Sequence, residues 1–255
     1  WVTTPREVAS SSEVIFTSLP GPIEVETVAL GGDGLIWGIA PGAIYVDLST
    51  GSPTAIRRVA ERIEAAGGHV VDAPVSGGVQ GADKGTLAVM VGGNPEIVER
   101  IRPLLEILGG SIVHVGGVGS GTVAKLVHNA ISMTTRIVIQ EGMALAVKAG
   151  VDPEVMLNVL CEASFGKQLV LTDHIPDLVL KGDFDHPRFS LGLSHKDVSL
   201  ALELARELNV PMGMAEMADE EIQRGIDRGW AGRDNLVTFL LAEERAGVSV
   251  RSSGP

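Results

Sequence analysis

Two polar residues four positions apart stand at the start of a long apolar segment. Lys125 and Asn129 follow the glycine-rich run Gly116–Gly121, so a helix that begins there would carry both on one face, one turn apart. A lysine held against an apolar helix face is costly unless it has a partner, and desolvation lowers its affinity for a proton. Such an amine can act as an acid or a base. The pair therefore predicts proton-transfer chemistry at the start of this helix.

A second chemical segment, Asp72–Gly85, follows a predicted strand and is rich in glycine. Glycines let backbone N–H groups converge on an anion without obstruction by a Cβ atom, and Ser76 adds a hydroxyl donor. One interpretation is a nest for a carboxylate, built around Ser76, Gly77 and Gly78. An ordinary flexible loop has the same composition, and composition alone leaves both interpretations open.

A third set of residues lies where strands are predicted to end. Leu19 and Pro20 close one predicted strand, and Thr50 follows the next. In doubly wound sheets, ligands bind beyond the carboxyl ends of the strands. These positions could therefore contact a dinucleotide, although most strand ends have no such role.

These segments depend on the elements that hold them. Over the first 115 residues short apolar strands alternate with helices, which is typical of βαβ units around a buried sheet. The predicted strands cover 14–19, 43–47, 69–72, 87–91 and 112–115, and the predicted helices begin at Pro22, Pro53 and Pro95. The sequence therefore predicts an α/β domain over residues 1–115.

The sequence from residue 116 to about 250 is predicted to be helical. A helix from about 121 to 149 has no proline and has apolar residues on most faces, which predicts a long buried helix that joins the two parts. Further helices are expected at 153–163, 166–179, 194–209, 213–228 and 234–246. Residues 251–255 are expected to form a disordered tail.

Composition narrows the classes of partner. The net charge of −12 disfavours nucleic acid and anionic membrane surfaces. No apolar run is long enough to cross a membrane. The single cysteine, Cys161, excludes a disulfide framework and a cysteine-based metal cluster, and the six histidines lack metal-ligand spacing. We therefore expect a cytoplasmic protein with no metal site, in which Cys161 is a small core residue.

The motif D-A-P-V-S-G-G that begins at Asp72 and the motif G-x-x-G-x-G-x-x-x-K-x-x-x-N that begins at Gly116 together resemble the β-hydroxyacid dehydrogenases. The match spans essentially the whole chain, and two long motifs in the right order are specific. The resemblance implies a Rossmann-type domain, a long linking helix and an all-α domain that helps form a homodimer or homotetramer. It also implies NAD or NADP as cofactor and a small 3-hydroxy acid as substrate.

The resemblance assigns roles to matched positions. Lys125 would be the catalytic lysine, and Asn129 would bind substrate one turn further along. The substrate carboxylate would be held by Ser76, Gly77 and Gly78, and the nicotinamide cofactor would be contacted by Leu19, Pro20, Thr50 and, in a later motif, Lys196. His195, beside Lys196, receives no role.

One part of the family pattern is missing. The family's G-x-G-x-x-G motif, its first strand and the polar or basic residues after its second strand have no counterpart in these 255 residues. We expect them upstream of Trp1, which leaves the Rossmann-type domain incomplete at its N-terminus. The run Gly117–Gly121 is no substitute, because it opens the long helix. Without that segment the chain would lack the pyrophosphate cradle and the residue that chooses between NAD and NADP.

The prediction is therefore an NAD(P)-dependent oxidoreductase that interconverts a small 3-hydroxy acid and its semialdehyde, with Lys125 as general acid and base. Two related enzymes are alternatives. An imine reductase usually replaces this lysine, and a 6-phosphogluconate dehydrogenase relative would need a basic phosphate site that we do not find. A non-catalytic binding module on the same fold is a third alternative, and the retained Lys125 and Asn129 argue against it.

Overall fold

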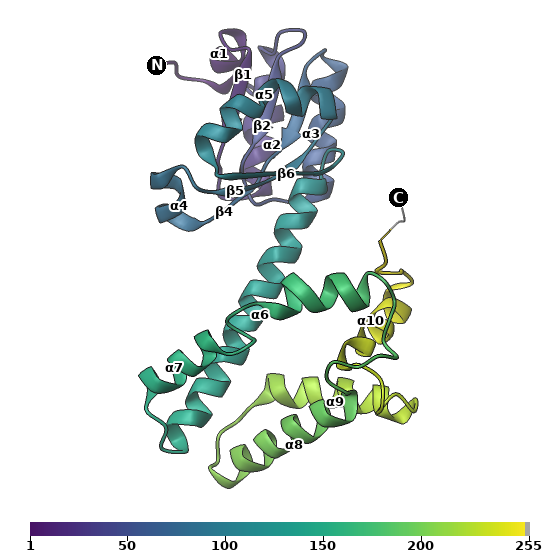
Figure 1. The fold of residues 1–255 in the computed structure, drawn as a ribbon. Coiled ribbons are helices and arrows are strands. Elements are labelled where there is room, and N and C mark those ends of the chain that lie inside the picture. Colours follow the sequence, from purple (N-terminus) through teal and green to yellow (C-terminus); the bar gives the residue numbers. More distant parts are fainter. Residues whose placement is uncertain (253–255) are drawn as a thin grey trace. The chain divides into compact units, whose positions relative to one another are not determined.

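The computed structural model describes residues 1–252 and divides the chain into two compact units (Figure 1). The first unit spans Trp1–Ser132 and the second begins at Met133. Residues 253–255, the end of the predicted tail, lie outside the described residues. Arg251, at the start of that tail, donates to the Glu243 carboxylate (2.6 Å). Each unit is described by itself below.

A six-stranded sheet forms the centre of the first unit. Its strands are β1 (Val14–Thr17), β2 (Ile44–Asp47), β3 (His69–Asp72), β4 (Val75–Ser76), β5 (Ala88–Gly92) and β6 (Ser111–Gly116). Strands β1, β2 and β3 are parallel neighbours. Strand β5 pairs antiparallel with the end of β3 and with β4, and β6 lies parallel along its other edge. The five predicted strands are confirmed, and β4 is an addition.

Helices cover both faces of this sheet. Successive residues of a strand point to opposite faces, and β2 is buried on both. Tyr45 joins one apolar cluster with α3 (Pro53–Ala65), whereas Ile44 and Val46 join another with α5 (Pro95–Leu108). The unit also contains α1 (Pro5–Ser10), α2 (Pro22–Leu30), η1 (Leu35–Trp37) and α4 (Gly78–Lys84). Burial on both faces is the pattern of an α/β sheet, so the predicted fold class is confirmed.

The helices begin where the sequence predicts. Helices α2, α3 and α5 each start with a proline, whose fixed φ suits the first turn and whose missing N–H needs no partner there. The Asn94 side chain accepts from the Glu96 N–H (2.9 Å), and the Ser52 side chain caps α3 in the same way. Because α2 and α3 follow β1 and β2, their first turns lie near the carboxyl edge of the sheet.

The long helix α6 (Ser120–Lys148) is confirmed, but its predicted burial is wrong. Val127, Ile131 and Ile137 are exposed, although the apolar residues on most faces predicted a core helix. The reason is that no apolar cluster of either unit includes the middle of α6. Near its start Lys125 is buried, and near its end Leu145 is buried.

The second unit is helical throughout its described residues. After the end of α6 it contains α7 (Pro153–Glu162), η2 (Val170–Val179), α8 (Leu191–Glu207), α9 (Gly213–Asp227), η3 (Asn235–Thr238) and α10 (Phe239–Ala246). Leu145, Leu202 and Met212 belong to one buried cluster, and Phe184 and Leu191 belong to another. The predicted helices are thus present, although η2 is a π-helix and Cys161 is exposed rather than part of the core. The described helices include none that is both long enough and apolar enough to span a bilayer.

Candidate active site

Lys125 lies one turn inside α6, where the helix touches the sheet directly. Its side chain is buried, with 8% exposed. Gly121 is on the same helix face, four residues earlier, and a Cβ atom there would overlap the carbonyl oxygen of Met90 and lie 2.7 Å from that of Asp72. Strands β3 and β5 therefore contact the backbone of the first turn of α6. This contact fixes the place from which Lys125 extends.

A buried carboxylate holds the same helix end. Asp72, the last residue of β3, accepts hydrogen bonds from the Gly119 N–H at Oδ1 (2.7 Å) and from the Thr122 N–H at Oδ2 (2.6 Å). The Thr122 hydroxyl also donates to Oδ2 (2.8 Å). The first N–H groups of a helix have no partner within it, and a negative charge there also favours the helix dipole. Asp72 thus anchors the start of α6, three residues before Lys125.

The two ionisable groups at this place both respond to burial. Burial lowers the pKa of the Lys125 amine, and no other cause acts on that pKa. Burial also raises the pKa of Asp72, and hydrogen bonds from Gly119 and Thr122 oppose that rise. An amine that gives up its proton more readily than an ordinary lysine can exchange a proton with a hydroxyl or carbonyl oxygen.

The predicted glycine nest is an ordered turn between β4 and α4. Ser76 ends β4, Gly77 precedes α4 with φ 140°, and Gly78 begins it with φ 64°. Both φ values lie where a residue other than glycine would be strained. No side chain caps the first turn of α4, so its N–H groups are free of a side-chain acceptor. Such a turn has the donors that a carboxylate needs.

The two sequence motifs meet along one strand. Ser76 pairs with Ala88 of β5, while Gly121 of α6 contacts Met90 of the same strand. The glycine turn and the start of the lysine helix are therefore neighbours in the first unit. Asn129, one turn beyond Lys125, is half-buried, and its Oδ1 lies 3.2 Å from Nδ1 of His128.

Polar side chains also organise the ends of β1 and β2. The Asp47 carboxylate accepts from the hydroxyls of Thr17 (2.9 Å) and Ser49 (2.6 Å). The Ser49 hydroxyl in turn accepts from the Leu19 N–H (2.8 Å). Pro20 and Thr50 follow these residues and are exposed at the same edge of the sheet. The predicted cofactor positions therefore lie on two loops that a buried network ties together.

Comparison with known proteins agrees with this arrangement. Residues 1–116 match the family model described as the NAD binding domain of 6-phosphogluconate dehydrogenase. Residues 119–240 match the model described as NAD-binding of NADP-dependent 3-hydroxyisobutyrate dehydrogenase. The chain is 37% identical over 245 residues to 2-(hydroxymethyl)glutarate dehydrogenase of Eubacterium barkeri, covering 96% of this chain and 81% of that protein. The chain belongs to the β-hydroxyacid dehydrogenase family.

Other members of the family support the same conclusion. The chain is 37% identical over 212 residues to 2-hydroxy-3-oxopropionate reductase of Escherichia coli strain K12, covering 82% of this chain and 72% of that protein. A solved structure of Mycobacterium tuberculosis 3-hydroxyisobutyrate dehydrogenase with L-serine matches with a TM-score of 0.60 and 29% identity, covering 92% of this chain and 81% of that one. The protein is thus an NAD(P)-dependent dehydrogenase of the 3-hydroxyacid type.

The loops at the carboxyl edge of the sheet leave room for the nicotinamide part of a dinucleotide. Gly21 precedes α2, no side chain caps that helix, and only the Glu24 carboxylate would lie near a Cβ atom at Gly21. Gly51 has open space around it. Backbone atoms of both loops are therefore accessible to a ligand, as expected at the edge where such sheets bind dinucleotides. Leu19, Pro20 and Thr50 would hold this group, which supplies the hydride acceptor or donor.

The remaining predicted cofactor residue belongs to the second unit. Lys196 lies on α8 and forms an exposed ion pair with its neighbour Asp197 (2.9 Å). His195 next to it bonds Asp219 of α9 through Nδ1 (2.9 Å), and Ser199 lies near the same nitrogen (3.5 Å). A hydrolytic Ser-His-Asp triad uses both ring nitrogens, so this cluster joins two helices rather than forming a nucleophile. The role of Lys196 stays a prediction.

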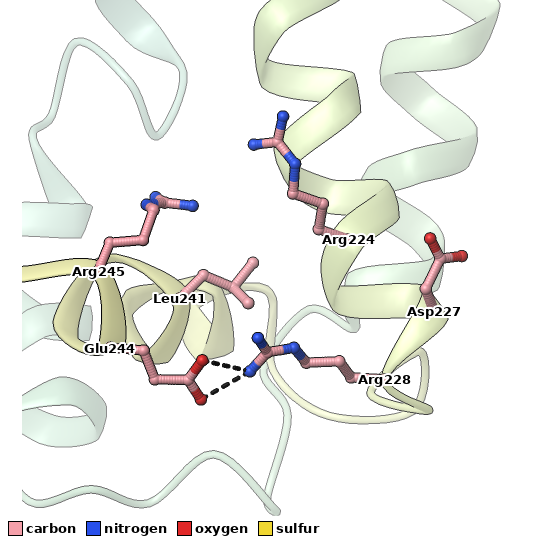
Figure 2. Close-up of a pocket in the computed structure, with 6 residues that line it drawn as sticks. All are labelled: Arg224, Asp227, Arg228, Leu241, Glu244 and Arg245. Carbon is pink, nitrogen blue, oxygen red and sulfur yellow. Dashed lines mark hydrogen bonds and ion pairs between the residues drawn. The ribbon is translucent and has the colours of Figure 1, made fainter.

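A cavity lies in the second unit, at the C-terminal end of α9 and along α10. Its volume is about 600 Å³, and Arg224, Arg228 and Arg245 line it with Glu244 (Figure 2). Each arginine is paired: Arg228 with Glu244 (2.6 Å), and both others with Glu221 (2.6 Å each). We call these five residues the arginine network. Glu220 also pairs with Arg224 (3.5 Å), so three carboxylates balance the three arginines and leave no excess positive charge for an anion. The described residues also contain no cluster of possible metal ligands.

Reasoning from the sequence misses two buried carboxylates that organise the candidate site. Asp72 was recognised only as the first letter of a motif, and Asp47 was given no role. A signal was present, because each ends a short apolar strand, and a carboxylate in a strand buried on both faces needs a specific partner. The partners themselves, Thr122 and Ser49, could not be inferred from spacing alone.

Proposed function

We propose that this protein interconverts a small 3-hydroxy acid and its semialdehyde, with Lys125 as the group that exchanges the proton. The observation that carries the proposal is the buried amine of Lys125, with its lowered pKa, on a helix end that packs against the same strand as the Ser76 turn. An amine and a carboxylate-sized set of donors are the two elements that this reaction needs from the protein.

The names of the relatives support the class of substrate. 2-(Hydroxymethyl)glutarate, 3-hydroxyisobutyrate and 2-hydroxy-3-oxopropionate share a carboxylate and an oxygen-bearing carbon separated by one carbon. We infer that Ser76, Gly77 and Gly78 bind the carboxylate and that Asn129 binds the substrate near the reacting oxygen. A fixed anchor at one end of a short substrate sets the position of the reacting carbon at the other.

The proton has a clear route in this proposal. In oxidation, the neutral Lys125 amine accepts the proton of the substrate hydroxyl. The carbon that bears this hydroxyl loses its hydrogen as hydride and becomes the carbonyl carbon. In reduction, the ammonium form returns a proton to the carbonyl oxygen. NAD or NADP accepts or supplies the hydride when bound. Burial of the amine assists oxidation, because it favours the neutral form that can act as a base.

This proposal is favoured over imine reduction and over binding without catalysis. Neither alternative requires an amine that exchanges a proton with a substrate hydroxyl, yet Lys125 is buried at a cost that a merely structural lysine would avoid by staying exposed. A 6-phosphogluconate-like substrate would need unpaired basic residues for its phosphate, and the arginine network, whose arginines are all paired, does not provide them.

We also infer that the protein forms a homodimer or homotetramer. Exposed apolar side chains follow one another along α6, and a groove of about 410 Å³ there is lined by Met133, Ile137 and Met214 among others. Contiguous apolar surface of this kind commonly marks an interface.

The acidic chain favours neither nucleic acid nor membrane as a partner, and its single cysteine is consistent with a cytoplasmic location.

The decisive experiment replaces Lys125 by methionine, which has a similar length and no charge. We expect Lys125→Met to lower turnover by at least about 100-fold, because one acid–base group typically contributes about 100-fold to 10,000-fold to the rate. Binding of NADH or NADPH, followed by fluorescence, should be unchanged in the full-length protein. Lys148→Met, at the exposed end of α6, is the matched control and should have wild-type turnover. Wild-type-like turnover of Lys125→Met would end the proposal.

The substrate is tested by a panel assay with NAD and with NADP. We expect 3-hydroxyisobutyrate, 3-hydroxypropionate or glycerate to be oxidised with a higher kcat/KM than 4-hydroxybutyrate. The last compound has one more carbon between carboxylate and hydroxyl, so it cannot satisfy the anchor and the amine together. A preference for 4-hydroxybutyrate would contradict the proposed role of the Ser76 turn.

A further inference from the structure

Four residues that end neighbouring strands lie side by side across the sheet. Thr17 of β1 pairs in register with Asp47 of β2, Asp47 with Asp72 of β3, and Asp72 with Gly92 of β5. We call these four residues the polar row. Asp47 is 4% exposed and Asp72 is 1% exposed, so two carboxylates are buried on adjacent strands. Buried carboxylates are costly and need strong donors around them.

The Asp47 half of the polar row faces the cofactor loops. Oδ1 of Asp47 accepts from the Thr17 hydroxyl, the Ser49 hydroxyl and the Ser49 N–H (3.2 Å). Ser49 then links this carboxylate to the Leu19 N–H on the preceding loop. The loops after β1 and β2 are therefore joined through one hydroxyl, which is itself buried.

The Asp72 half of the polar row faces the catalytic helix. Its two oxygens accept three hydrogen bonds from Gly119 and Thr122, all at the start of α6. Gly92, the last member of the row, leaves space for this contact, because a Cβ atom there would overlap Oδ1 of Asp72. The carboxylate therefore reaches past β5 to the helix only because that position is glycine.

We propose that Asp47 and Asp72 are positioning residues, Asp47 for the loops that hold the nicotinamide and Asp72 for the helix that carries Lys125. The proposal rests on the proposed function of Lys125. Hydride and proton leave the same substrate, so the groups that receive them must keep a fixed distance from one another. Adjacent strands of a sheet packed on both faces provide a rigid base for both.

A purely structural role would give a different kinetic result. If the carboxylates only stabilised the fold, any variant would lose active enzyme, and cofactor affinity and turnover per folded molecule would stay unchanged. If each positions a different part of the site, one variant should change cofactor binding and the other should change turnover. The two halves of the polar row can therefore be separated by measuring both quantities.

For the cofactor half the informative variants are Ser49→Ala and Asp47→Asn. Ser49→Ala leaves the Leu19 N–H without its acceptor, and we expect the Kd of NADH or NADPH, measured by fluorescence, to rise about 10-fold. Turnover at saturating cofactor should stay within about threefold. Asp47→Ala removes the oxygen that accepts all three bonds and should raise the Kd at least as much as Ser49→Ala, whereas Asp47→Asn keeps an oxygen at the Oδ1 position and should recover most of the affinity lost in Asp47→Ala.

For the helix half the informative variants are Asp72→Asn and Thr122→Val. An asparagine has one carbonyl oxygen, so its NH₂ group must face a backbone N–H of Gly119 or Thr122. We expect Asp72→Asn to lower kcat by about 100-fold, because a small misplacement of the reacting group has an effect of that order, with an unchanged Kd for cofactor. Hydrogen exchange of the Gly119 and Thr122 amides should become faster. Thr122→Val removes one of the three bonds and should show the same effects, but more weakly.

The controls separate this proposal from the proposed function. Asp33→Asn, an exposed carboxylate, should change nothing. The proposal is overturned if Ser49→Ala and Asp72→Asn change Kd and kcat in the same proportion, or if Asp72→Asn keeps wild-type turnover and slow amide exchange. If Lys125→Met keeps full turnover, the proposed function fails, whereas cofactor fluorescence and amide exchange still report whether the two carboxylates hold the loops and the helix.

Discussion

The polar row of the first unit and the arginine network of the second place charge in opposite ways. The polar row buries two carboxylates almost completely and gives them only neutral donors. The arginine network pairs full charges at the surface, with Arg224 and Arg245 more than half exposed. Exposed ion pairs contribute little to stability, whereas a buried carboxylate is costly unless its surroundings are well formed.

This difference shows which observation identifies a functional site. The arginine network borders a cavity of about 600 Å³ and carries more charge, yet each of its arginines is paired with a carboxylate. The polar row connects directly to the predicted cofactor loops and to the helix of Lys125. The energetic cost of burial, rather than cavity volume, locates the candidate active site in this protein.

The largest effect on the polar row should come from filling the contact between helix and sheet. Gly121→Ala places a Cβ atom against backbone atoms of Met90, Asp72 and Gly92, none of which can move without distorting β3 or β5. We expect a loss of about 2–3 kcal/mol in the free energy of unfolding, together with a loss of turnover. Urea denaturation measures the first and the dehydrogenase assay the second.

Gly117, four residues before Gly121, provides the control for this prediction. Gly117→Ala introduces the same methyl group where no atom lies within 4 Å, and its φ is not in the left-handed region. It should unfold within about 0.5 kcal/mol of the wild type, as for other surface substitutions. If Gly121→Ala behaves like Gly117→Ala, the helix end is not held against the sheet as described.

A pH profile should show a second, smaller effect of burial. Because burial lowers the pKa of Lys125, kcat for oxidation should rise about tenfold per pH unit and level off below the ordinary lysine value of 10.5. In reduction the ammonium form is required, so kcat should fall over the same range. A rise in oxidation rate that continues beyond pH 10.5 would show that the amine is not desolvated.

Stability should depend on the same two groups in a predictable sense. The folded-state pKa of Lys125 is depressed, so its burial opposes folding at neutral pH, and this penalty disappears as the pH rises past the unfolded value of 10.5. The pKa of Asp72 is raised in the folded state, so the contribution of Asp72 to the free energy of unfolding is most favourable below its ordinary pKa of 3.8. That contribution is lost as the pH rises through the folded-state pKa. Both groups are therefore kept at a cost at neutral pH, which is consistent with a functional reason for each.

Much of the fold could be predicted from the sequence, because local signals act over short distances. Prolines at helix starts and alternating apolar strands gave nearly correct bounds for α5 and β3, since propensity and burial point to the same structure there. The segment of β4 and α4 was harder, because its glycines permit several backbone conformations. The burial of α6 was predicted wrongly, because an apolar helix face indicates that something covers it without indicating what.

The site was predictable only as far as its motifs extend. Lys125 and the Ser76 turn were identified from type and spacing together with the family resemblance. Asp72 and Thr122 lie fifty positions apart and meet only because β3 ends beside the start of α6. Their contact depends on the register of the sheet, which a single sequence does not reveal at this distance.

The smallest effect should come from the arginine network. A hydrogen bond from Arg245 lowers the pKa of Glu221, burial opposes this effect, and a hydrogen bond from Arg224 lowers the pKa further. The carboxylate therefore stabilises the folded state above its ordinary pKa of 4.5, and this stabilisation is lost as the pH falls. Glu221→Gln should reduce the free energy of unfolding by less than about 1 kcal/mol at low salt. At about 1 M salt the difference should disappear, because the charges are screened. Urea denaturation at both salt concentrations, with the exposed Glu203→Gln as control, measures this, and kcat should be unchanged. A large loss of turnover in Glu221→Gln would mean that the arginine network contributes to the reaction, and the contrast with the polar row would no longer hold.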